Sequence, residues 1–254
     1  MNNEKYIKNM ISEGKRLDSR GLVDFREVTI EKGVVKTAEG SARVKIGDTE
    51  VLAGVKLKVM EPYPDTPNEG GLMVGLEFVP FANPKFETGP PNATAVEMSR
   101  VIDRGIRESK TIDTEKLCIK AGEAVWSVSV DIHVMNDDGN LLDAGALAAL
   151  AALEDANLLK YDLEAKKLIR EEAGVLPVVH KPIAVTIVKI GDSLLLDPTL
   201  EEWNALEARV TITTMENGDI CALQKGGDGY FTKEELEKAA DLSLEAGKAL
   251  REKL

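Results

Sequence analysis

The chain has 254 residues, 43% of them hydrophobic, so it is long enough to bury the core of one large or two medium domains. Its formal net charge of −12 argues against a free-standing nucleic-acid binder, because contacts to phosphates dominate such binding, although a local basic face can overcome this repulsion. The absence of a long apolar run and of a secretory leader predicts a soluble, cytoplasmic protein without a membrane anchor.

Cysteine and histidine are too sparse to predict a metal centre. Cys118 and Cys221 lie in strand-like apolar settings outside any C-x-x-C or Cys/His cluster, so both are expected to be buried thiols. His133 and His180 are far apart in the sequence. We therefore expect no metal site, no histidine-based catalytic triad and no bound cofactor.

The first part of the chain predicts one helix and several strands. Apolar residues at helical spacing between 6 and 11 indicate an amphipathic helix that ends before Gly14, and the polar arm RLDSRG follows at 16–21. The further predicted elements are a short strand at 26–32, a hairpin of 41–46 with 50–59, a proline-rich loop at 61–71 and a strand at 72–78.

The segment 92–109, NATAVEMSRVIDRGIRES, predicts an amphipathic helix. At about 100° per residue, its apolar residues fall within roughly 80° of each other, and its arginines fall within roughly 60° on the opposite side. The apolar face consists of Ala95, Met98, Ile102 and Ile106. The opposite face, which we call the arginine stripe, consists of Arg100, Arg104 and Arg107.

A long strand followed by a small-residue helix forms the centre of the chain. Apolar and polar residues alternate from 124 to 135, which is the clearest strand signal in the sequence. The turn NDDGN follows at 136–140, and the apolar segment 141–157 predicts a helix enclosed on most sides. A glycine-containing turn that opens a helix leaves several backbone N–H groups unpaired, which is a common way to hold anions.

The remaining residues predict a second group of strands and a final helix. The mixed segment 160–181 is interpreted as the connection to this second unit. Strands are expected at 184–190, 193–196, 208–215 and 220–224, the last two joined by a two-residue turn at Asn217-Gly218. Thr232 and Glu235 form a capping-box pattern before the C-terminal helix. Strands followed by packed helices, occurring twice, indicate an α+β fold with two related halves.

These motifs, in this order, resemble the RNase PH superfamily, and most of all the non-catalytic RNase PH-like subunit of the archaeal exosome. The resemblance rests on RLDSRG, VIDRGIRES, VWSVSVDIHVMNDDGN before LLDAGALAALAAL, and LLLDPTLEE. It implies a ribosomal protein S5 domain 2-like core followed by an RNase PH C-terminal domain. The implied division is an N-terminal helix and arm at 1–30, RNase PH domain 1 at 31–165 and the C-terminal domain at 166–254.

The resemblance also implies a phosphate site that this sequence has lost. Active members bind inorganic phosphate through a Gly-Ser/Thr-Arg motif at the start of a helix, where the arginine forks two phosphate oxygens. The matching residues here are Gly139, Asn140 and Leu141, with Asp143 in the first helical turn. Because an acidic residue there stabilises its own helix by about 0.3–1 kcal/mol, we interpret the stretch as a degenerate phosphate site on a helix that caps itself.

The catalytic acid of active members is missing from its matching position as well. A positioned acid contributes about 10²–10⁴-fold to a reaction rate. The resemblance places this acid in a strand that reads EARVTI here, with Arg209 at the aspartate position. Asp197, Glu201 and Glu202 of LLLDPTLEE are interpreted as carboxylates of a solvated loop, and a residual catalytic role is the alternative.

The arginine stripe allows two interpretations. It can be a solvated face whose side chains pair along the helix, at about 0.2–0.5 kcal/mol per pair. The possible pairs are Glu97 with Arg100, Asp103 with Arg107 and Arg104 with Glu108. Because such pairs are weak, RNA phosphates can displace them, and the resemblance implies that Arg100, Arg104 and, to a smaller extent, Arg107 contact single-stranded RNA. This binding is expected to be independent of sequence and sensitive to salt.

The function implied by the resemblance is that of a non-catalytic subunit in a hexameric ring that degrades RNA 3′-to-5′ by phosphorolysis. The expected partners are a catalytic RNase PH-like homologue in a trimer of heterodimers, RNA-binding cap subunits and single-stranded RNA. In that ring the chain helps to structure the active site of the catalytic partner. The alternatives are an active phosphate-dependent 3′-5′ exoribonuclease acting as a homo-oligomer and, more distantly, a small-molecule kinase of the same fold type.

Overall fold

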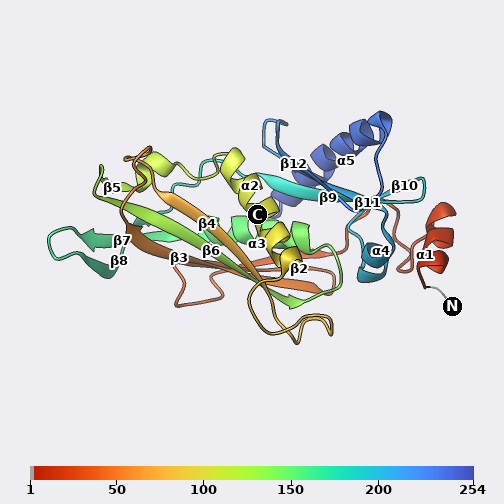
Figure 1. Ribbon diagram of the computed structural model, residues 1–254, viewed down its shortest axis with the longest axis horizontal. Coiled ribbons are helices and arrows are strands. Elements are labelled where there is room, and N and C mark those ends of the chain that lie inside the picture. The colour runs from red at the N-terminus through yellow and green to blue at the C-terminus, as the bar shows by residue number, and fades with distance from the viewer. Residues whose placement is uncertain (1–2) are drawn as a thin grey trace.

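The computed structural model describes residues 3–254 (Figure 1). The largest β-sheet is built by strands between residues 28 and 136. This sheet contains β1 (Val28–Lys32), β2 (Gly40–Ile46), β3 (Thr49–Met60), β4 (Gly71–Phe78), β5 (Cys118–Lys120) and β6 (Ala124–Asn136). Its order is β1-β2-β3-β6-β4, with β5 paired to β6. Buried residues alternate with more exposed ones along β3, as expected for a strand with one face on the core.

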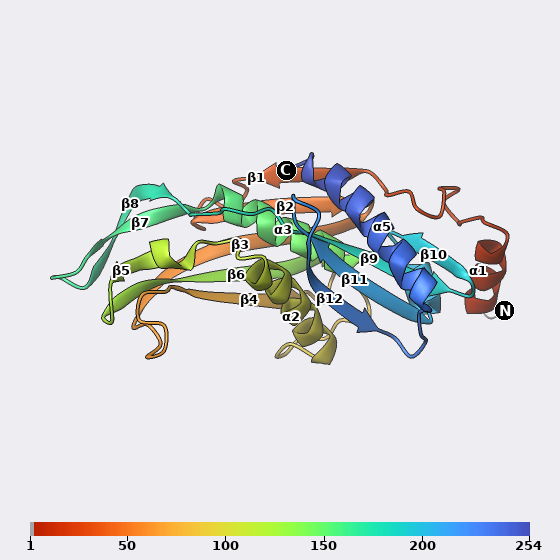
Figure 2. The same cartoon turned by 90° about the horizontal axis from the view of Figure 1, so that it is seen from above.

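A second sheet and a separate hairpin follow. The second sheet has the order β10-β9-β11-β12 and is antiparallel throughout. Its strands are β9 (Ile183–Ile190), β10 (Ser193–Leu196), β11 (Ala208–Thr214) and β12 (Ile220–Gly226). The hairpin consists of β7 (Asn157–Asp162) and β8 (Lys167–Val175). It projects from the end of the molecule opposite helix α1 (Asn3–Ser12) in both views (Figures 1 and 2).

Helices form the layers between and outside the sheets. The remaining helices are α2 (Ala93–Glu108), the 3-10 helix η1 (Thr114–Leu117), α3 (Leu141–Asp155), α4 (Leu200–Ala205) and α5 (Lys233–Arg251). α3 contacts β2, β3 and β6 as well as β9, so it lies between the two sheets, whereas α5 crosses the second sheet over β9 and β11 (Figure 2). On β11, Thr213 lies beside Gly105 of α2 and Thr214 beside Gly247 of α5. Successive strand residues point to opposite faces, so α2 and α5 cover opposite faces of this sheet.

Small residues allow α3 to lie close to its neighbours. A Cβ added to Gly40 of β2 would lie 2.6 Å from the Ala156 nitrogen, just after the end of α3. A Cβ added to Gly145 within α3 would lie 3.0 Å from Ile102 Cδ1 of α2. Because backbone and side chains approach this closely, most of the buried residues of the two sheets form one cluster that is continuous across α3. A smaller cluster joins α1 and α4 to Val188, Ile190 and Leu195 of the second sheet.

Most elements predicted from the sequence are confirmed, together with the α+β class. The two hairpins, the long strands, the helices at 92–109 and 141–157, the second group of strands and the C-terminal helix occur within a few residues of their predicted bounds. The turn between β11 and β12 is longer than the predicted two residues, because Met215 N donates to Asp219 O at 2.8 Å and Gly218 takes φ 90°.

The segment 160–181 connects α3 to the second sheet, as interpreted, but most of it forms the β7–β8 hairpin, whose two strands were not predicted. β8 is exposed along nearly its whole length, so it lacks the alternation of apolar residues by which a strand is recognised. The short elements η1, β5 and α4 were not predicted for a related reason, since each is too short to show a period. The hairpin contains the predicted domain boundary at residue 165, and the division at 30 and 165 stays a prediction.

The substitution Gly40→Ala tests the close approach of β2 to α3. The added Cβ would meet backbone atoms, including the Ala156 nitrogen at 2.6 Å, so we expect the free energy of unfolding to fall by about 1–3 kcal/mol. Gly54→Ala on β3 is the matched control, because the nearest atom to its added Cβ is Ala38 Cβ at 3.9 Å. Urea denaturation measures both variants, and equal midpoints for the two would contradict the packing argument.

Candidate functional site

Helix α2 separates an apolar face from an arginine face, as predicted. The helix begins after Asn92, whose side chain accepts a hydrogen bond from the Ala95 nitrogen. Its buried residues are Ala95, Met98, Val101, Ile102, Gly105 and Ile106. Arg100, Arg104 and Arg107 are exposed on the other side. The guanidinium groups of the arginine stripe are therefore open to solvent in the isolated chain.

Arg107 is the most firmly held arginine of the stripe. Its Nη2 lies 2.8 Å from Asp103 Oδ1, which confirms one of the pairs predicted along the helix. The same nitrogen donates to the carbonyl oxygen of Leu72 on β4 at 2.9 Å. The hydrogen bonds that Arg107 donates to Asp103 raise the pKa of its guanidinium above the ordinary value. This arginine is therefore the least available of the three for a new ligand.

The other two predicted pairs do not occur in the part of the chain that the structure describes. Arg104 Nη1 donates to Gln224 Oε1 of β12 at 3.0 Å. Glu97 turns away from the stripe and lies 2.6 Å from Arg209 Nη2 on β11. Arg100 takes part in no hydrogen bond or ion pair with residues 3–254. Arg100 and Arg104 thus keep most of their capacity to bind phosphates, because neither is neutralised by a carboxylate.

The degenerate phosphate motif has a backbone shape without the side chain that the chemistry needs. Gly139 takes φ 81°, and a Cβ there would lie 2.5 Å from the Pro198 oxygen. Asn140 takes the left-handed value φ 54° at the N-cap of α3. Leu141 is 5% exposed, so an aliphatic side chain in the core occupies the position that the resemblance assigns to the phosphate-binding arginine. The leucine side chain at this position has no donors with which to bind two phosphate oxygens.

The prediction that α3 caps itself is wrong. The Asn140 side chain makes no capping hydrogen bond and instead donates from Nδ2 to Asp197 Oδ1 at 2.8 Å. The Asp143 carboxyl points into the interior, where it is 2% exposed and lies against Thr186 of β9. Burial raises the pKa of Asp143 to about 7. The sequence pattern suggested a surface acid on the helix dipole, but the helix buries this residue because nearly every side of α3 is covered.

Asp197 is the centre of a buried ionic cluster, so its interpretation as a solvated carboxylate is wrong. It has no exposed surface, and Arg26 Nη2 donates to its Oδ1 at 2.7 Å. Its Oδ2 accepts from Arg20 Nη1 at 2.8 Å. Burial alone would raise the pKa of Asp197, but the hydrogen bonds and charge of Arg26 outweigh this effect and lower it below the ordinary value. The carboxylate therefore remains ionised and joins the N-terminal arm to the loop before α4.

Glu202 is also buried rather than solvated. It lies 2.6 Å from Arg16 Nη2, and the two side chains are 1% and 0% exposed. Its Oε2 also accepts a hydrogen bond from the Thr199 nitrogen, which completes a capping box at the start of α4. Glu201, the third carboxylate of this loop, is exposed. The first arginine of the RLDSRG arm therefore has a structural partner 186 residues along the chain.

Arg209 lies at the position predicted for the lost catalytic acid, and its charge is already neutralised. The side chain is 8% exposed and its Nη2 is 2.6 Å from Glu97 Oε1. Its guanidinium carbon lies 5.5 Å from the centre of the Trp203 ring, within cation–π range. A guanidinium held in this way cannot donate a proton to a leaving oxygen at ordinary pH, because arginine does not lose its proton in proteins.

A small cavity of about 220 Å³ lies where α2, α3 and α4 begin. Gly139, Asn140 and Leu141 line it together with Trp203 of α4. Phe78 and Phe86 also line it and stack with ring centres 4.2 Å apart. Its described lining residues include one lysine, Lys85, and one carboxylate, Asp137, but no arginine. The cavity thus has mainly aromatic, aliphatic and amide walls and lacks the guanidinium fork that binds two phosphate oxygens.

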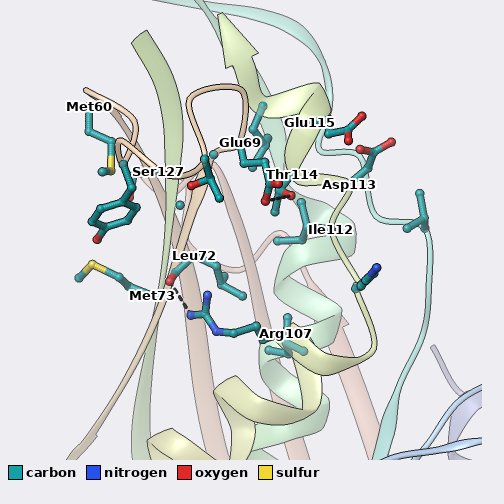
Figure 3. Close-up of a pocket in the computed structure, with 18 of the residues that line it drawn as sticks. Met60, Glu69, Leu72, Met73, Arg107, Ile112, Asp113, Thr114, Glu115 and Ser127 are labelled. Carbon is teal, nitrogen blue, oxygen red and sulfur yellow. Dashed lines mark hydrogen bonds between the residues drawn. The ribbon is translucent and has the colours of Figure 1, made fainter. Parts of the chain in front are cut away.

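A larger cleft of about 710 Å³ lies at the C-terminal end of α2 (Figure 3). Arg107 occupies one end of it, and Asp113 and Glu115 occupy the other. Its lining residues come from several segments far apart in the sequence, so no local sequence pattern indicates it. The arginine stripe therefore opens at this end into a cleft of mixed charge.

Two structural features, a metal-binding cluster and a membrane-spanning helix, are absent from the described residues. Residues 3–254 contain no group of three or more His, Cys, Asp or Glu side chains arranged to hold a metal ion. No helix in the same part of the chain is long and apolar enough to cross a membrane.

Two family models match this chain. Residues 24–158 match the model of domain 1 of the 3′ exoribonuclease family, RNase PH, and residues 180–246 match domain 2 of the same family. The chain belongs to the 3′ exoribonuclease family. The resemblance on which the site was interpreted is confirmed, and so is the order of an RNase PH domain 1 before an RNase PH C-terminal domain.

Relatives within the 3′ exoribonuclease family are similar over nearly the whole chain. The protein named exosome complex component Rrp42 from Thermoplasma acidophilum is 50% identical over 98% of this chain and 94% of its own length. Its namesake from Methanothermobacter thermautotrophicus is 46% identical over 95% of this chain and 90% of its own length. These matches favour the exosome interpretation over a kinase of the same fold type.

Solved structures show the same similarity. One chain of the Archaeoglobus fulgidus exosome with RNA bound to the active site has a TM-score of 0.92 and 43% identity, covering 99% of this chain and 97% of that chain. A chain of an archaeal exosome core has a TM-score of 0.88 and 41% identity, covering 99% of this chain and 95% of that chain.

The substitution Asp197→Asn tests the ionic cluster. It leaves Arg20 and Arg26 without a buried anion, so we expect the free energy of unfolding to fall by about 3–5 kcal/mol at pH 7. Glu201→Gln, exposed in the first turn of α4, is the control and should change little. Because the pKa of Asp197 is lowered in the folded chain, its contribution is present above an unfolded value of 3.8 and is lost as pH falls through the folded pKa. Urea denaturation at neutral and acid pH would refute this role if the wild type and Asp197→Asn lost stability in parallel.

Proposed function

We propose that the chain is a non-catalytic subunit of an exosome ring that degrades RNA 3′-to-5′ by phosphorolysis. The start of α3 carries the proposal, because Leu141 is buried in the core at the position where active members bind phosphate with an arginine. Arg209, at the position of the catalytic acid, is paired with Glu97. The exosome names of the relatives and of the similar solved structures support the assembly.

In this proposal the chain acts through its partners. It alternates with a catalytic RNase PH-like homologue as a trimer of heterodimers, and RNA-binding cap subunits cover one face of the ring in the archaeal cytoplasm. The well-ordered packing around α3 and the Asp197 cluster would then serve to present a fixed surface to the catalytic homologue and to structure its active site. The phosphate-binding site and the catalytic acid both belong to that homologue.

The arginine stripe contributes binding of single-stranded RNA. Arg100 and Arg104 are exposed and have no carboxylate partner among residues 3–254, so their charges are available to phosphates. Arg107 is the weaker candidate, because Asp103 and the Leu72 carbonyl already occupy it. Because contacts to phosphates carry no sequence information, an arginine stripe that binds the RNA backbone binds RNA of any sequence.

The first experiment measures activity. The chain purified alone, incubated with single-stranded RNA and inorganic phosphate, is expected to release no nucleoside diphosphate, because Leu141 cannot bind phosphate. The same assay on the chain co-purified with a catalytic homologue is the positive control and should release nucleoside diphosphates. Release by the chain alone would instead establish the alternative, an active phosphate-dependent exoribonuclease that functions as a homo-oligomer.

The second experiment measures RNA affinity in the assembled complex. Arg100→Gln with Arg104→Gln should weaken binding and reduce the slope of log K against log salt by about 1.4, since each lost phosphate contact on single-stranded RNA contributes about 0.7. Lys167→Gln with Arg170→Gln removes the same charge from the exposed strand β8 and is the control. If both double variants had the same affinity and slope at low salt, the stripe would not contact RNA.

A further inference from the structure

Asp143 is a buried carboxyl that the proposed function does not use. It lies in the first turn of α3, is 2% exposed and faces the second sheet at Thr186. Neither of its oxygens has a hydrogen-bond partner within residues 3–254. The Thr186 hydroxyl pairs with the Thr211 hydroxyl, 2.9 Å away, and either of the two can be the donor. An ionised carboxylate in this place would have Thr186 as its nearest source of donors and no partner within hydrogen-bond distance, which is costly in a protein interior.

A second unpaired acceptor lies three residues earlier. Asn140 is fully buried, its Nδ2 donates to Asp197 Oδ1 at 2.8 Å, and its Oδ1 has no partner in the described chain. The orientation of this amide is fixed, because exchanging its nitrogen and oxygen would place two oxygens against each other at Asp197. The two arginines bound to Asp197 keep that carboxylate ionised and hence an acceptor. Asn140 Oδ1 therefore requires a donor that the amides and hydroxyls around it do not supply.

One proton satisfies both groups. The Asn140 side chain is close enough to interact with the Asp143 carboxyl, and a protonated carboxyl has one O–H donor. We propose that the folded chain holds Asp143 as a neutral carboxylic acid that donates a hydrogen bond to Asn140 Oδ1. This bond fixes the left-handed N-cap of α3 and connects it to the Asp197 cluster. A proton thus stabilises the strand–turn–helix shape from which the phosphate motif has been lost.

The surrounding charges favour the neutral acid. Asp197 is the charged group that acts on Asp143, and its negative charge opposes ionisation. Burial has the larger effect and raises the pKa of Asp143 from 3.8 to about 7. The hydrogen-bonding groups of Thr186 and Asn140 act in the opposite direction and lower the pKa of Asp143, but burial outweighs them. The other ionic groups of the adjoining elements are paired with one another, namely Arg16 with Glu202, Arg20 and Arg26 with Asp197, and Glu97 with Arg209.

The sign of the pH dependence follows from this arrangement. Because the folded pKa lies above the unfolded value of 3.8, the folded chain binds one more proton than the unfolded chain between these two values. Raising the pH through this interval therefore increases the equilibrium constant of unfolding by up to about tenfold per pH unit, and the effect ends above about pH 7. This is opposite to the acid sensitivity expected from Asp197.

Asp143→Asn separates this contribution from all others. Asparagine keeps the shape and supplies an N–H donor for Asn140 Oδ1, so the variant should fold but lose this dependence on pH. The ratio of wild-type to Asp143→Asn unfolding constants, measured in urea on the full chain, should rise about tenfold or more between about pH 5 and about pH 6.5. Asp131→Asn, on the exposed face of β6, is the control and should give a constant ratio. A ratio for Asp143→Asn that is independent of pH would overturn the proposal.

A second measurement covers the case in which Asp143→Asn does not fold. In wild-type chain labelled with ¹³C at aspartate carboxyls, one buried carboxyl resonance should keep the shift of the protonated acid up to about pH 6. If every aspartate resonance has the shift of the ionised form at that pH, Asp143 is not a donor and the proposal fails. Neither measurement needs RNA or a partner subunit, so their outcome is independent of the proposed function.

Discussion

A carboxylate with no exposed surface must be neutralised, and the neutralisation of Asp197 positions much of the structure. Arg20 and Arg26 provide the compensating charge from the N-terminal arm, and Asn140 provides an amide N–H from the start of α3. Two segments that are distant in sequence, the N-terminal arm and the start of α3, are thereby fixed to the loop before α4. The turn that would hold phosphate in active relatives is positioned by this interaction and carries no cation of its own.

The arginines of the chain fall into two groups with different surroundings. Arg16, Arg26 and Arg209 are buried, and each is paired with a carboxylate. Arg100 and Arg104 lie on the surface of α2 without such a partner among the described residues. The interior arginines contribute little to the surface potential, because carboxylates neutralise them. A chain with a net charge of −12 can still present a local basic face at the exposed Arg100 and Arg104.

How much could be predicted depended on whether the physical cause was local. The periods of α2, β6 and α3 follow from which faces are buried, so the sequence predicted these elements and the exposed position of the arginine stripe. The burial of Asp197 and Glu202 could not be predicted, because their arginine partners lie about 170 to 190 residues away, as the pairs of Arg26 and Arg16 show. Asp143 was misjudged for the same reason, since the strand that covers it, β9, follows much later in the chain.

The contact between Arg16 and Glu202 has a consequence for the order of folding. The two residues are 186 positions apart, so their pairing requires that the chain be synthesised at least as far as Glu202. The arm leaves the ribosome early, and Arg16 stays without this partner until α4 emerges. Docking of the arm is thus a late step of synthesis, but it does not require a complete second sheet, because β11 and β12 follow Glu202 in the chain.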